Sequence, residues 1–172
     1  MKCLLKGSVK DVMTVDGSFE SRRGKGKGEV TATLKDKKVR AESTFTVQKP
    51  TFDFAGTFYY DYEKDNSKKI SFATQNKIQP QAIDSKNTVE IFNERYAFNV
   101  GASTEGKFPS GKQKANFEVQ LPTGRKFSAN VDRDVNLQDG KGSGNAHIVA
   151  TDELPNRQQR QVIVDLKIND IS

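Results

Sequence analysis

The side chains that enzymes use most often as nucleophiles, bases and metal ligands are scarce in this chain. It contains one histidine, His147, and one cysteine, Cys3. A zinc site needs three or four such ligands, and no local nucleophile motif supports a pair formed by Cys3 and His147. We therefore expect no catalytic residue, no metal ion and no cofactor. We expect His147 to lie on a polar strand face.

Carboxylates and glycines are more numerous, but their spacing matches no known site. Asp132, Asp134 and Asp139 do not follow the pattern of a calcium-binding loop, and we interpret 132–134 as solvated charges at a turn or strand end. The glycine-rich stretches at 22–28 and 139–144 match neither the P-loop nor the dinucleotide-binding motif. These residues favour a protein that is not an enzyme.

The net positive charge of the chain is compatible with several kinds of anionic partner and does not identify one. Lysine and arginine number 28 against 22 aspartates and glutamates, a net charge of +6. Such an excess attracts phosphate, sulfated polymers or anionic lipid head groups, and its densest cluster is Arg22, Arg23, Lys25 and Lys27. Most aromatic residues share strand parity with aliphatic residues, whereas binding of nucleic acid needs them beside the cations. We expect no nucleic-acid partner and leave open an anionic surface.

The elements that must carry these residues follow from an alternation with a period of two. From 39 to 47, odd positions hold Val, Ala, Ser, Phe and Val, and even positions hold Arg, Glu, Thr and Thr. The alternation returns at 52–62, 115–121 and 162–168. Successive side chains of a strand point to opposite faces, so each segment has an apolar and a polar face. Helical spacing is absent over three turns, and we predict almost no helix.

The strands are expected to form consecutive antiparallel hairpins, because short polar turns separate them. The fold class is all-β: an antiparallel meander of about ten amphipathic strands forming a large curved sheet, open or rolled toward a barrel. We expect residues 1–172 to form one β-sheet module and to be a fragment of a much longer chain. The expected strands are 2–13, 29–35, 38–48, 51–63, 69–79, 88–92, 96–100, 112–121, 125–132, 145–151 and 160–169.

The connections between these strands carry the turn residues glycine, proline and asparagine. Residues 22–28 are expected as a flexible connection or a weak edge strand. Between 47 and 52 the apolar parity flips, and Pro50 supports a turn there. The other expected turns and loops are Asp16-Gly17, 63–69, 80–86, 93–95, 106–111, 122–124, 139–144 and 154–156.

An apolar sheet face of this size requires a cover. Burying one phenylalanine contributes roughly 1.5–3 kcal/mol, and the chain has 11 of them. Leaving most of them in water would cost on the order of tens of kcal/mol, more than the net stability of a domain. A second sheet, closure into a barrel or lipid could each cover the face. Small or polar residues among the inward positions favour lipid over dense packing of two sheets; they are Ser43, Gly56, Thr74, Asn76 and Ala129.

The candidate lipid-binding residues share the apolar parity and would act by burial alone. The alternative is that they form the core between two sheets. They are Phe45, Phe52, Phe54, Phe58, Tyr60, Phe72, Phe117, Val119, Phe127, Val162, Val164 and Leu166.

Two segments of the chain resemble a known family. Residues 112–136 contain the hairpin LPTGRKFSANVDRDV, and residues 142–168 contain the turn LPN and lead into a last strand that ends in DLKIND. They resemble the β-rich region of the large lipid transfer proteins, the family of insect apolipophorins, vitellogenins and apolipoprotein B. The likeness is greatest to arthropod apolipophorins and to the apolipophorin-like group 14 allergens of mites.

This resemblance implies a segment of a very long secreted lipoprotein that carries phospholipid and neutral lipid through body fluid. In that family the lipid contact is diffuse, through amphipathic sheet faces, so no catalytic residue carries over. The implied partners are the two lipid classes and the remainder of the longer chain, and a lipoprotein receptor or an anionic surface is left open as a further partner. We therefore predict lipid binding and transport. The alternative is a stand-alone β-sandwich or barrel that acts as a protein-interaction or structural module.

Overall fold

A computed structural model describes the chain except for residues 10–12, 35–36, 62–63, 65–67, 108–109, 139–140, 157 and 172. Every regular element in the described part is a β-strand, and this part holds no helix of the length and hydropathy that crossing a membrane requires. The all-β prediction is therefore confirmed. The strands are β1 (Lys2–Val9), β2 (Met13–Arg22), β3 (Lys25–Leu34), β4 (Lys37–Gln48), β5 (Thr51–Tyr60), β6 (Lys69–Gln79), β7 (Ala82–Ile91), β8 (Glu94–Glu105), β9 (Gly111–Gln120), β10 (Lys126–Gln138), β11 (Lys141–Glu153) and β12 (Gln159–Ile171).

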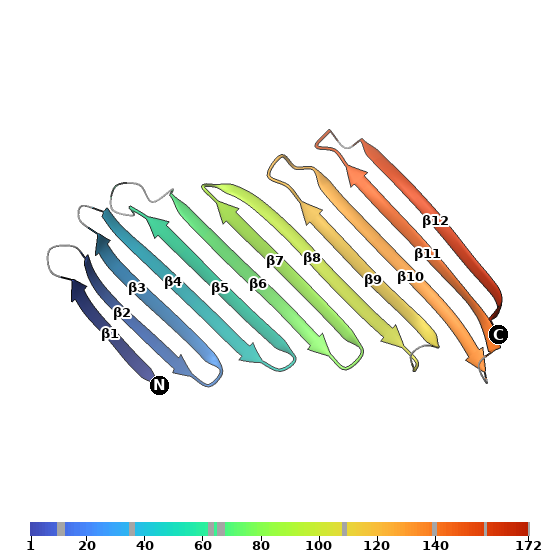
Figure 1. Ribbon diagram of the computed structural model, residues 1–172, viewed down its shortest axis with the longest axis horizontal. Helices are drawn as coiled ribbons and strands as arrows, with labels where there is room; N and C mark the ends of the chain where they lie inside the picture. The colour runs from blue at the N-terminus through green and yellow to red at the C-terminus, as the bar shows by residue number, and fades with distance from the viewer. Residues whose placement is uncertain are drawn as a thin grey trace. The chain divides into compact units, whose positions relative to one another are not determined.

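All twelve strands belong to one sheet and follow one another in chain order, each hydrogen-bonded to the next (Figure 1). The order is linear, with β1 and β12 at its two ends, so the sheet is not closed into a barrel. The predicted antiparallel meander is confirmed, and of its two predicted forms the open one is correct. The alternative of a sandwich or barrel is wrong for the described residues, because a sandwich needs a second sheet and a barrel needs β1 to pair with β12.

The structure has twelve strands where about ten were predicted, and the clearest difference is at the N-terminal end, where β2 was not predicted. Asp16 and Gly17, predicted as a turn, lie inside β2 and pair with Lys6 and Leu5 of β1. A glycine suits this position because a Cβ atom there would be crowded, at 3.1 Å from Cγ2 of Val30 on the neighbouring strand. Pairing with two neighbouring strands thus outweighs a local turn signal.

The glycine-rich stretch at 22–28 is neither a flexible connection nor an edge strand. Arg23 and Gly24 form a two-residue turn in which both φ angles are positive, 50° and 77°, as hairpin turns of this length require. The residues that follow belong to β3, which lies between β2 and β4 inside the sheet. Both predictions for 22–28 were therefore wrong.

Several other predicted boundaries also change. The predicted loop 80–86 shrinks to a turn at 80–81, because β7 begins at Ala82. Some predictions lie partly outside the described residues. They are the strands 2–13, 29–35 and 51–63, the loop 63–69, the turn 106–111 and the loop 139–144, which include the undescribed residues 10–12, 35, 62–63, 65–67, 108–109 and 139–140. Within the described part, β5 ends at Tyr60, β9 begins at Gly111 and β11 begins at Lys141.

The chain divides into two compact units. The first unit consists of Met1–Asn76 and Asn87–Tyr96 and contains β1–β5. The second consists of Lys77–Lys86 and Ala97–Ser172 and contains β9–β12; β6–β8 contribute residues to both. In an antiparallel sheet, residues that pair directly lie on the same face. The registers within each unit therefore sort its side chains into two faces.

Neither unit encloses a core of the kind found in two-layer domains. Among the described residues, Val135 is the one apolar side chain that is buried, at 7% exposure, and no side chain is completely buried. The stability of the sheet thus depends on backbone hydrogen bonds and on cross-strand side-chain pairs. The apolar side of each unit is left without a covering protein layer in the described chain.

Candidate functional site

The first unit gathers its aromatic side chains on one face of the sheet. Phe45 pairs with Phe54, and the registers place Phe52, Phe58 and Tyr60 beside the aliphatic residues of β4. The turn after Val47 reverses the chain, so the parity flip between β4 and β5 keeps both apolar sets on the same side, as predicted. We name the set Phe19, Phe45, Phe52, Phe54, Phe58, Tyr60 and Phe72 the first apolar face.

Ring contacts hold part of this face together. The rings of Phe19 and Phe45 are stacked, with centroids 6.1 Å apart. The rings of Phe54 and Phe72 are tilted, with centroids 5.9 Å apart. The remaining surface stays open to solvent: Phe52, Phe58 and Phe72 are 40%, 42% and 38% exposed. About two fifths of each of these side chains is therefore available to an apolar partner.

Gly26 explains how the ring of Phe45 can lie flat on the sheet. The two residues pair across β3 and β4, and a Cβ atom at Gly26 would lie 2.1 Å from Cε1 of Phe45. The ring thus occupies the space of the missing side chain, an arrangement in which an aromatic residue covers a strand glycine. The glycines at 24–28 therefore serve the apolar face as well as the turn.

One end of the first apolar face carries amphipathic side chains. The ammonium of Lys37 donates a hydrogen bond of 2.5 Å to the hydroxyl of Tyr60 and lies 5.1 Å from the centroid of its ring. Both residues belong to this face by register. Tyrosine and lysine place an apolar body beside a polar tip, so this end of the face suits a boundary between oil and water.

The second unit presents a corresponding set, the second apolar face. Phe117 pairs with Val100 and Ala129, and Val119 pairs with Phe98 and Phe127. Across β11, Ala150 joins Ala129 to Val162. The face consists of Phe98, Val100, Phe117, Val119, Phe127, Val131, Ile148, Val162, Val164, Leu166 and Ile168. Its outer members are strongly exposed, with Phe117 at 45% and Val162 at 64%.

The second apolar face ends in an ion pair. Nε and Nη2 of Arg125 donate hydrogen bonds of 2.8 and 2.7 Å to the two carboxylate oxygens of Asp152. The guanidinium also lies 4.4 Å from the centroid of the Phe127 ring. The hydrogen bond from Arg125 lowers the pKa of Asp152 below its ordinary value. This bidentate pair keeps both charges paired at the margin of an apolar surface.

All twelve predicted lipid-binding residues lie on the two faces. The first apolar face holds six of them, namely Phe72 and the five that belong to β4 and β5, and the second apolar face holds the other six. The other members of the two faces were not predicted as lipid-binding residues; they are Phe19, Phe98, Val100, Val131, Ile148 and Ile168. Phe19 could have been found from the alternation Met13, Val15, Gly17 and Phe19, which the false turn signal at 16–17 obscured. The contact of the twelve residues with lipid stays a prediction.

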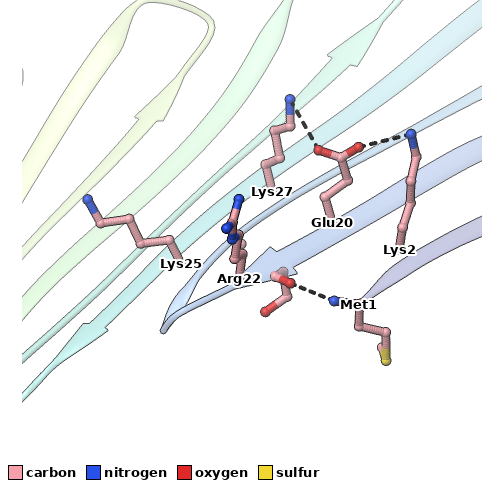
Figure 2. A pocket seen from close by; sticks show the side chains of 8 residues that line it. Met1, Lys2, Glu20, Arg22, Lys25 and Lys27 are labelled. Carbon is pink, nitrogen blue, oxygen red and sulfur yellow. Dashed lines mark hydrogen bonds and ion pairs between the residues drawn. The ribbon is translucent and has the colours of Figure 1, made fainter.

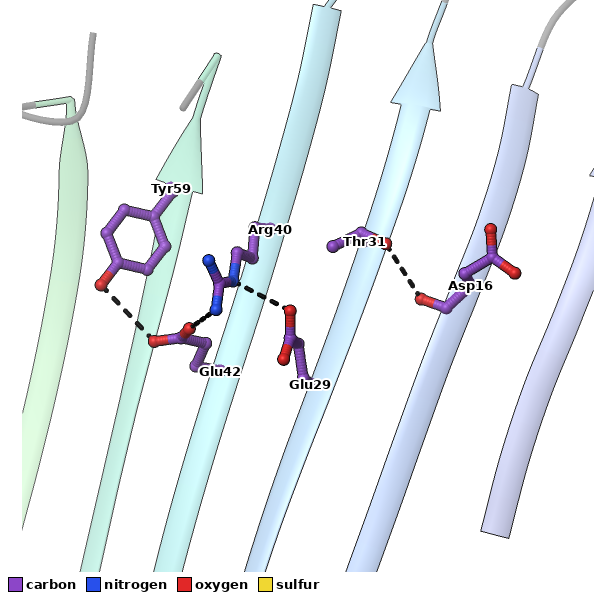
Figure 3. Close-up of polar contacts among 6 residues, drawn as sticks. All are labelled: Asp16, Glu29, Thr31, Arg40, Glu42 and Tyr59. Carbon is purple, nitrogen blue, oxygen red and sulfur yellow. Dashed lines mark hydrogen bonds and ion pairs between the residues drawn. The ribbon is translucent and has the colours of Figure 1, made fainter. Parts of the chain in front are cut away.

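The opposite face of the first unit is polar and neutralises its own charges. Figure 3 shows Arg40 between the carboxylates of Glu29 and Glu42, which pair directly across β3 and β4. Nε of Arg40 lies 3.1 Å from Glu29, and a second guanidinium nitrogen contacts Glu42. The hydroxyl of Tyr59 donates a long hydrogen bond of 3.5 Å to Glu42. Like charges that face each other across strands are thus bridged by a cation.

Three of the four residues of the predicted basic cluster, Arg22, Lys25 and Lys27, line a shallow hollow of about 460 Å³ at one end of this polar face, and Arg23 does not. Figure 2 shows the carboxylate of Glu20 between the ammonium groups of Lys2 and Lys27, at 3.1 and 3.7 Å. These two cations lower the pKa of Glu20, Lys2 having the larger effect. Arg22 and Lys25 also line the hollow. The cluster is thus partly neutralised, and a receptor or anionic surface as its partner stays a prediction.

His147 lies on the polar face of the second unit, as predicted. It pairs with Asp132 on one side and Asp165 on the other, and its Nδ1 lies 2.6 Å from the carboxylate of Asp165. In the described part of the chain no group of three or more His, Cys, Asp and Glu residues could hold a metal ion. Cys3 is a free, exposed thiol.

The fold and its faces define an open amphipathic β-sheet, and comparisons with known proteins identify relatives of the chain. It is 30% identical over 149 residues to the apolipophorins of Manduca sexta, 26% over 144 residues to those of Locusta migratoria and 28% over 146 residues to those of Drosophila melanogaster. The alignments cover 84%, 83% and 80% of this chain, which spans 4% of the length of each relative.

The chain is therefore homologous to the insect apolipophorins, which are large lipid transfer proteins, and the predicted resemblance is confirmed. The finer resemblance to mite group 14 allergens receives no support from these comparisons. No family model matches the chain. No solved structure matches it either.

Proposed function

We propose that this chain is the lipid-binding amphipathic sheet of a secreted, apolipophorin-like lipoprotein and that it takes part in lipid transport without catalysis. One observation carries the proposal. Each unit of the open sheet presents a partly exposed apolar face. On the first face Phe52 and Phe58 are 40% and 42% exposed, and on the second Phe117 is 45% exposed. Soluble monomers rarely expose contiguous apolar surfaces of this extent.

The two faces favour lipid over a second protein layer because of how their side chains vary in size. Gly28 pairs with Phe19, Gly26 with Phe45 and Ala129 with Phe117, so the surface is uneven. A protein layer would need complementary side chains at the density of a crystal. Acyl chains are fluid and can fill such gaps without a fixed partner shape. The amphipathic pairs at the margins, Tyr60 with Lys37 and Arg125 with Asp152, would then lie at the level of the head groups.

The partners that follow are phospholipid, neutral lipid and the remainder of a longer lipoprotein chain. The twelve predicted residues act by apolar burial, and the polar faces stay in water. The homology to proteins named apolipophorins supports this assignment, and the 4% of their length that the chain spans agrees with its being one segment of a larger lipid-carrying surface.

Flotation with vesicles tests the proposal. The purified chain is mixed with phosphatidylcholine vesicles and centrifuged through a density gradient, with a vesicle-free sample as the control. We expect the chain to rise with the vesicles and to keep its β-sheet circular dichroism spectrum. A chain that stays at the bottom, monomeric and folded, would contradict lipid binding and favour a protein-interaction module.

A further inference from the structure

The hairpin that joins β2 and β3 helps to place four cations around the shallow hollow of the first unit. Lys2 belongs to β1, Arg22 to β2, and Lys25 and Lys27 to β3. The registers put all four on the polar face, because Glu20 pairs with both Lys2 and Lys27, and Arg22, on the same side of β2 as Glu20, pairs with Lys25. One described carboxylate, that of Glu20, lines the hollow with them. The lining therefore carries an excess of positive charge.

Two of these cations face each other without a carboxylate to bridge them. Arg22 and Lys25 pair directly across β2 and β3, and like charges directly opposite each other are unfavourable. The carboxylate of Glu20 contacts Lys2 and Lys27 instead (Figure 2). Among the described residues, no carboxylate forms an ion pair with Arg22 or Lys25. This end of the hairpin thus keeps two adjacent cations that the sheet does not neutralise.

Like charges are treated differently elsewhere on the same face. Glu29 and Glu42 also pair directly, and Arg40 bridges them. In the cross-strand row that contains Lys25, the next described carboxylate is that of Asp53, two strands further along the sheet. An anion that bridges the cations at the hairpin must therefore come from outside the described chain.

Paired strands hold these cations in place. The turn between the strands has two residues, Arg23 and Gly24. The backbone N–H of Val47 donates a hydrogen bond of 2.6 Å to the carbonyl of Gly24, which ties the turn to the end of β4. Every residue of β2 pairs with a residue of β3. A ligand that binds a fixed surface of this kind loses less free energy to ordering of the protein.

The composition of the hollow favours a hydrated polyanion as its partner. Protein interfaces need apolar or aromatic anchors at their centre, and a membrane-binding surface buries apolar side chains beside its cations. Among the described lining residues, Met1 is the one large apolar side chain, and it is 80% exposed. No described aromatic residue lines the hollow, so nucleic-acid bases have no platform on which to stack.

The spacing of the cations favours a polymer over a single small anion. Neighbouring strands lie about 4.7–4.9 Å apart, so cations on β1, β2 and β3 form a strip about 10 Å wide. Single exposed ionic contacts contribute little, and binding therefore needs several anionic groups on one molecule. A sulfated polysaccharide carries such groups on hydrated sugar rings, which require neither an apolar anchor nor a stacking platform.

We propose that Lys2, Arg22, Lys25 and Lys27 form a docking surface for a sulfated polysaccharide. One sulfate group lies between Arg22 and Lys25, and the guanidinium binds two of its oxygens side by side. A second sulfate group competes with Glu20 for Lys2 and Lys27. The surface is on the face opposite the first apolar face, and the proposal does not depend on lipid binding.

Fluorescence anisotropy with a labelled heparin oligosaccharide tests the proposal. The wild-type chain should bind this probe and lose about tenfold or more in affinity between about 50 and 200 mM salt, as binding through several ionic contacts to a polyanion does. Uncharged dextran should not compete. The absence of heparin binding at low salt, or an affinity that does not depend on salt, would overturn the proposal.

Two double variants separate this surface from the net charge of the chain. Arg22→Gln with Lys25→Gln should weaken heparin binding by about 4- to 25-fold, the product of two exposed ionic contacts of about two- to fivefold each. The matched control is Lys141→Gln with Lys167→Gln, which removes the same charge from exposed positions of β11 and β12 and should bind as wild type. Equal weakening of the two double variants would overturn the proposal.

A variant of Glu20 gives a result that loss of folding cannot imitate. Glu20→Gln removes the carboxylate that occupies Lys2 and Lys27, so heparin should bind about twofold or more tightly than to the wild type. Unchanged or weaker binding by folded Glu20→Gln, judged by its circular dichroism spectrum, would overturn the placement of a sulfate at these two lysines and with it the proposed surface.

Competition with other polyanions identifies the class of partner. Heparin should displace both oligothymidylate and phosphatidylserine vesicles from the wild-type chain at equal concentrations of charge. A chain that prefers the oligonucleotide or the vesicles would overturn the polysaccharide assignment. Flotation with uncharged phosphatidylcholine vesicles reports on the apolar faces, so a failure of the proposed function is distinguishable from a failure of this surface.

Discussion

Phe117 offers a direct test of the apolar-face interpretation. Its side chain is 45% exposed and lies between Val100 and Ala129 on the second apolar face. Complete burial of a phenylalanine contributes about 1.5–3 kcal/mol, so the part that is still exposed corresponds to about 0.7–1.4 kcal/mol. If lipid covers that part, Phe117→Ala should weaken partitioning into phosphatidylcholine vesicles by about 3- to 10-fold.

The matched control is Asn116→Ala, because Asn116 precedes Phe117 on the same strand and belongs to the polar face. Partition constants are measured by sedimentation over a series of lipid concentrations. Urea unfolding of each variant is measured separately, since Phe117→Ala also removes contacts within the sheet. We expect Asn116→Ala to partition as wild type. Equal partition constants for the two variants, both folded, would refute the assignment of this face to lipid.

Two further predictions concern the sheet itself. Gly26→Val forces the ring of Phe45 from its place over the glycine, because a Cβ atom at position 26 would lie 2.1 Å from the ring, and it should lower the free energy of unfolding in urea by about 1–3 kcal/mol. The control is Gly7→Val, at a position where such a Cβ atom has no atom within 4 Å, and its free energy of unfolding should stay within about 0.5 kcal/mol of wild type. Equal losses of stability in the two variants would contradict the packing of Phe45 over Gly26. Arg125 lowers the pKa of Asp152 in the folded chain. The stabilisation from this ion pair is therefore fully present above the ordinary aspartate pKa of about 3.9. It is lost as the pH falls through the lower pKa of the folded state. The stability difference between wild type and Arg125→Gln, measured by urea unfolding, should therefore shrink from about pH 6 to about pH 2, and a difference that stays constant would show that the carboxylate contributes nothing.

The alternation along the sequence was sufficient to predict which side chains share a face. Phe45, Phe54 and Phe58 lie together because strand parity survives any error in strand ends, provided that the turn at 49–50 reverses the chain. The linear order of the strands was not predictable in the same way. An open sheet and a barrel differ only in whether β1 pairs with β12, and no local pattern in either strand reports that pairing.

Local signals failed where cross-strand neighbours decide the outcome. Asp16-Gly17 reads as a turn by composition, but Gly17 lies between Leu5 and Val30 in the sheet, where a residue without a side chain fits. Arg133 was interpreted as solvated because it stands between two aspartates. Its parity places it with Val131, and only the register with Gln113 shows that this cation lies on an apolar face.

The two faces of the sheet differ in whether their side chains find partners within the described chain. On the polar face of the first unit, Arg40 bridges two glutamates and Glu20 joins two lysines, so these charges find partners within the described chain. The apolar faces have no such partners, since no second layer formed by the described residues covers Phe58 or Phe117. This asymmetry, with one face that pairs charges internally and one apolar face that is partly exposed, is the physical basis for proposing an apolar partner for the sheet.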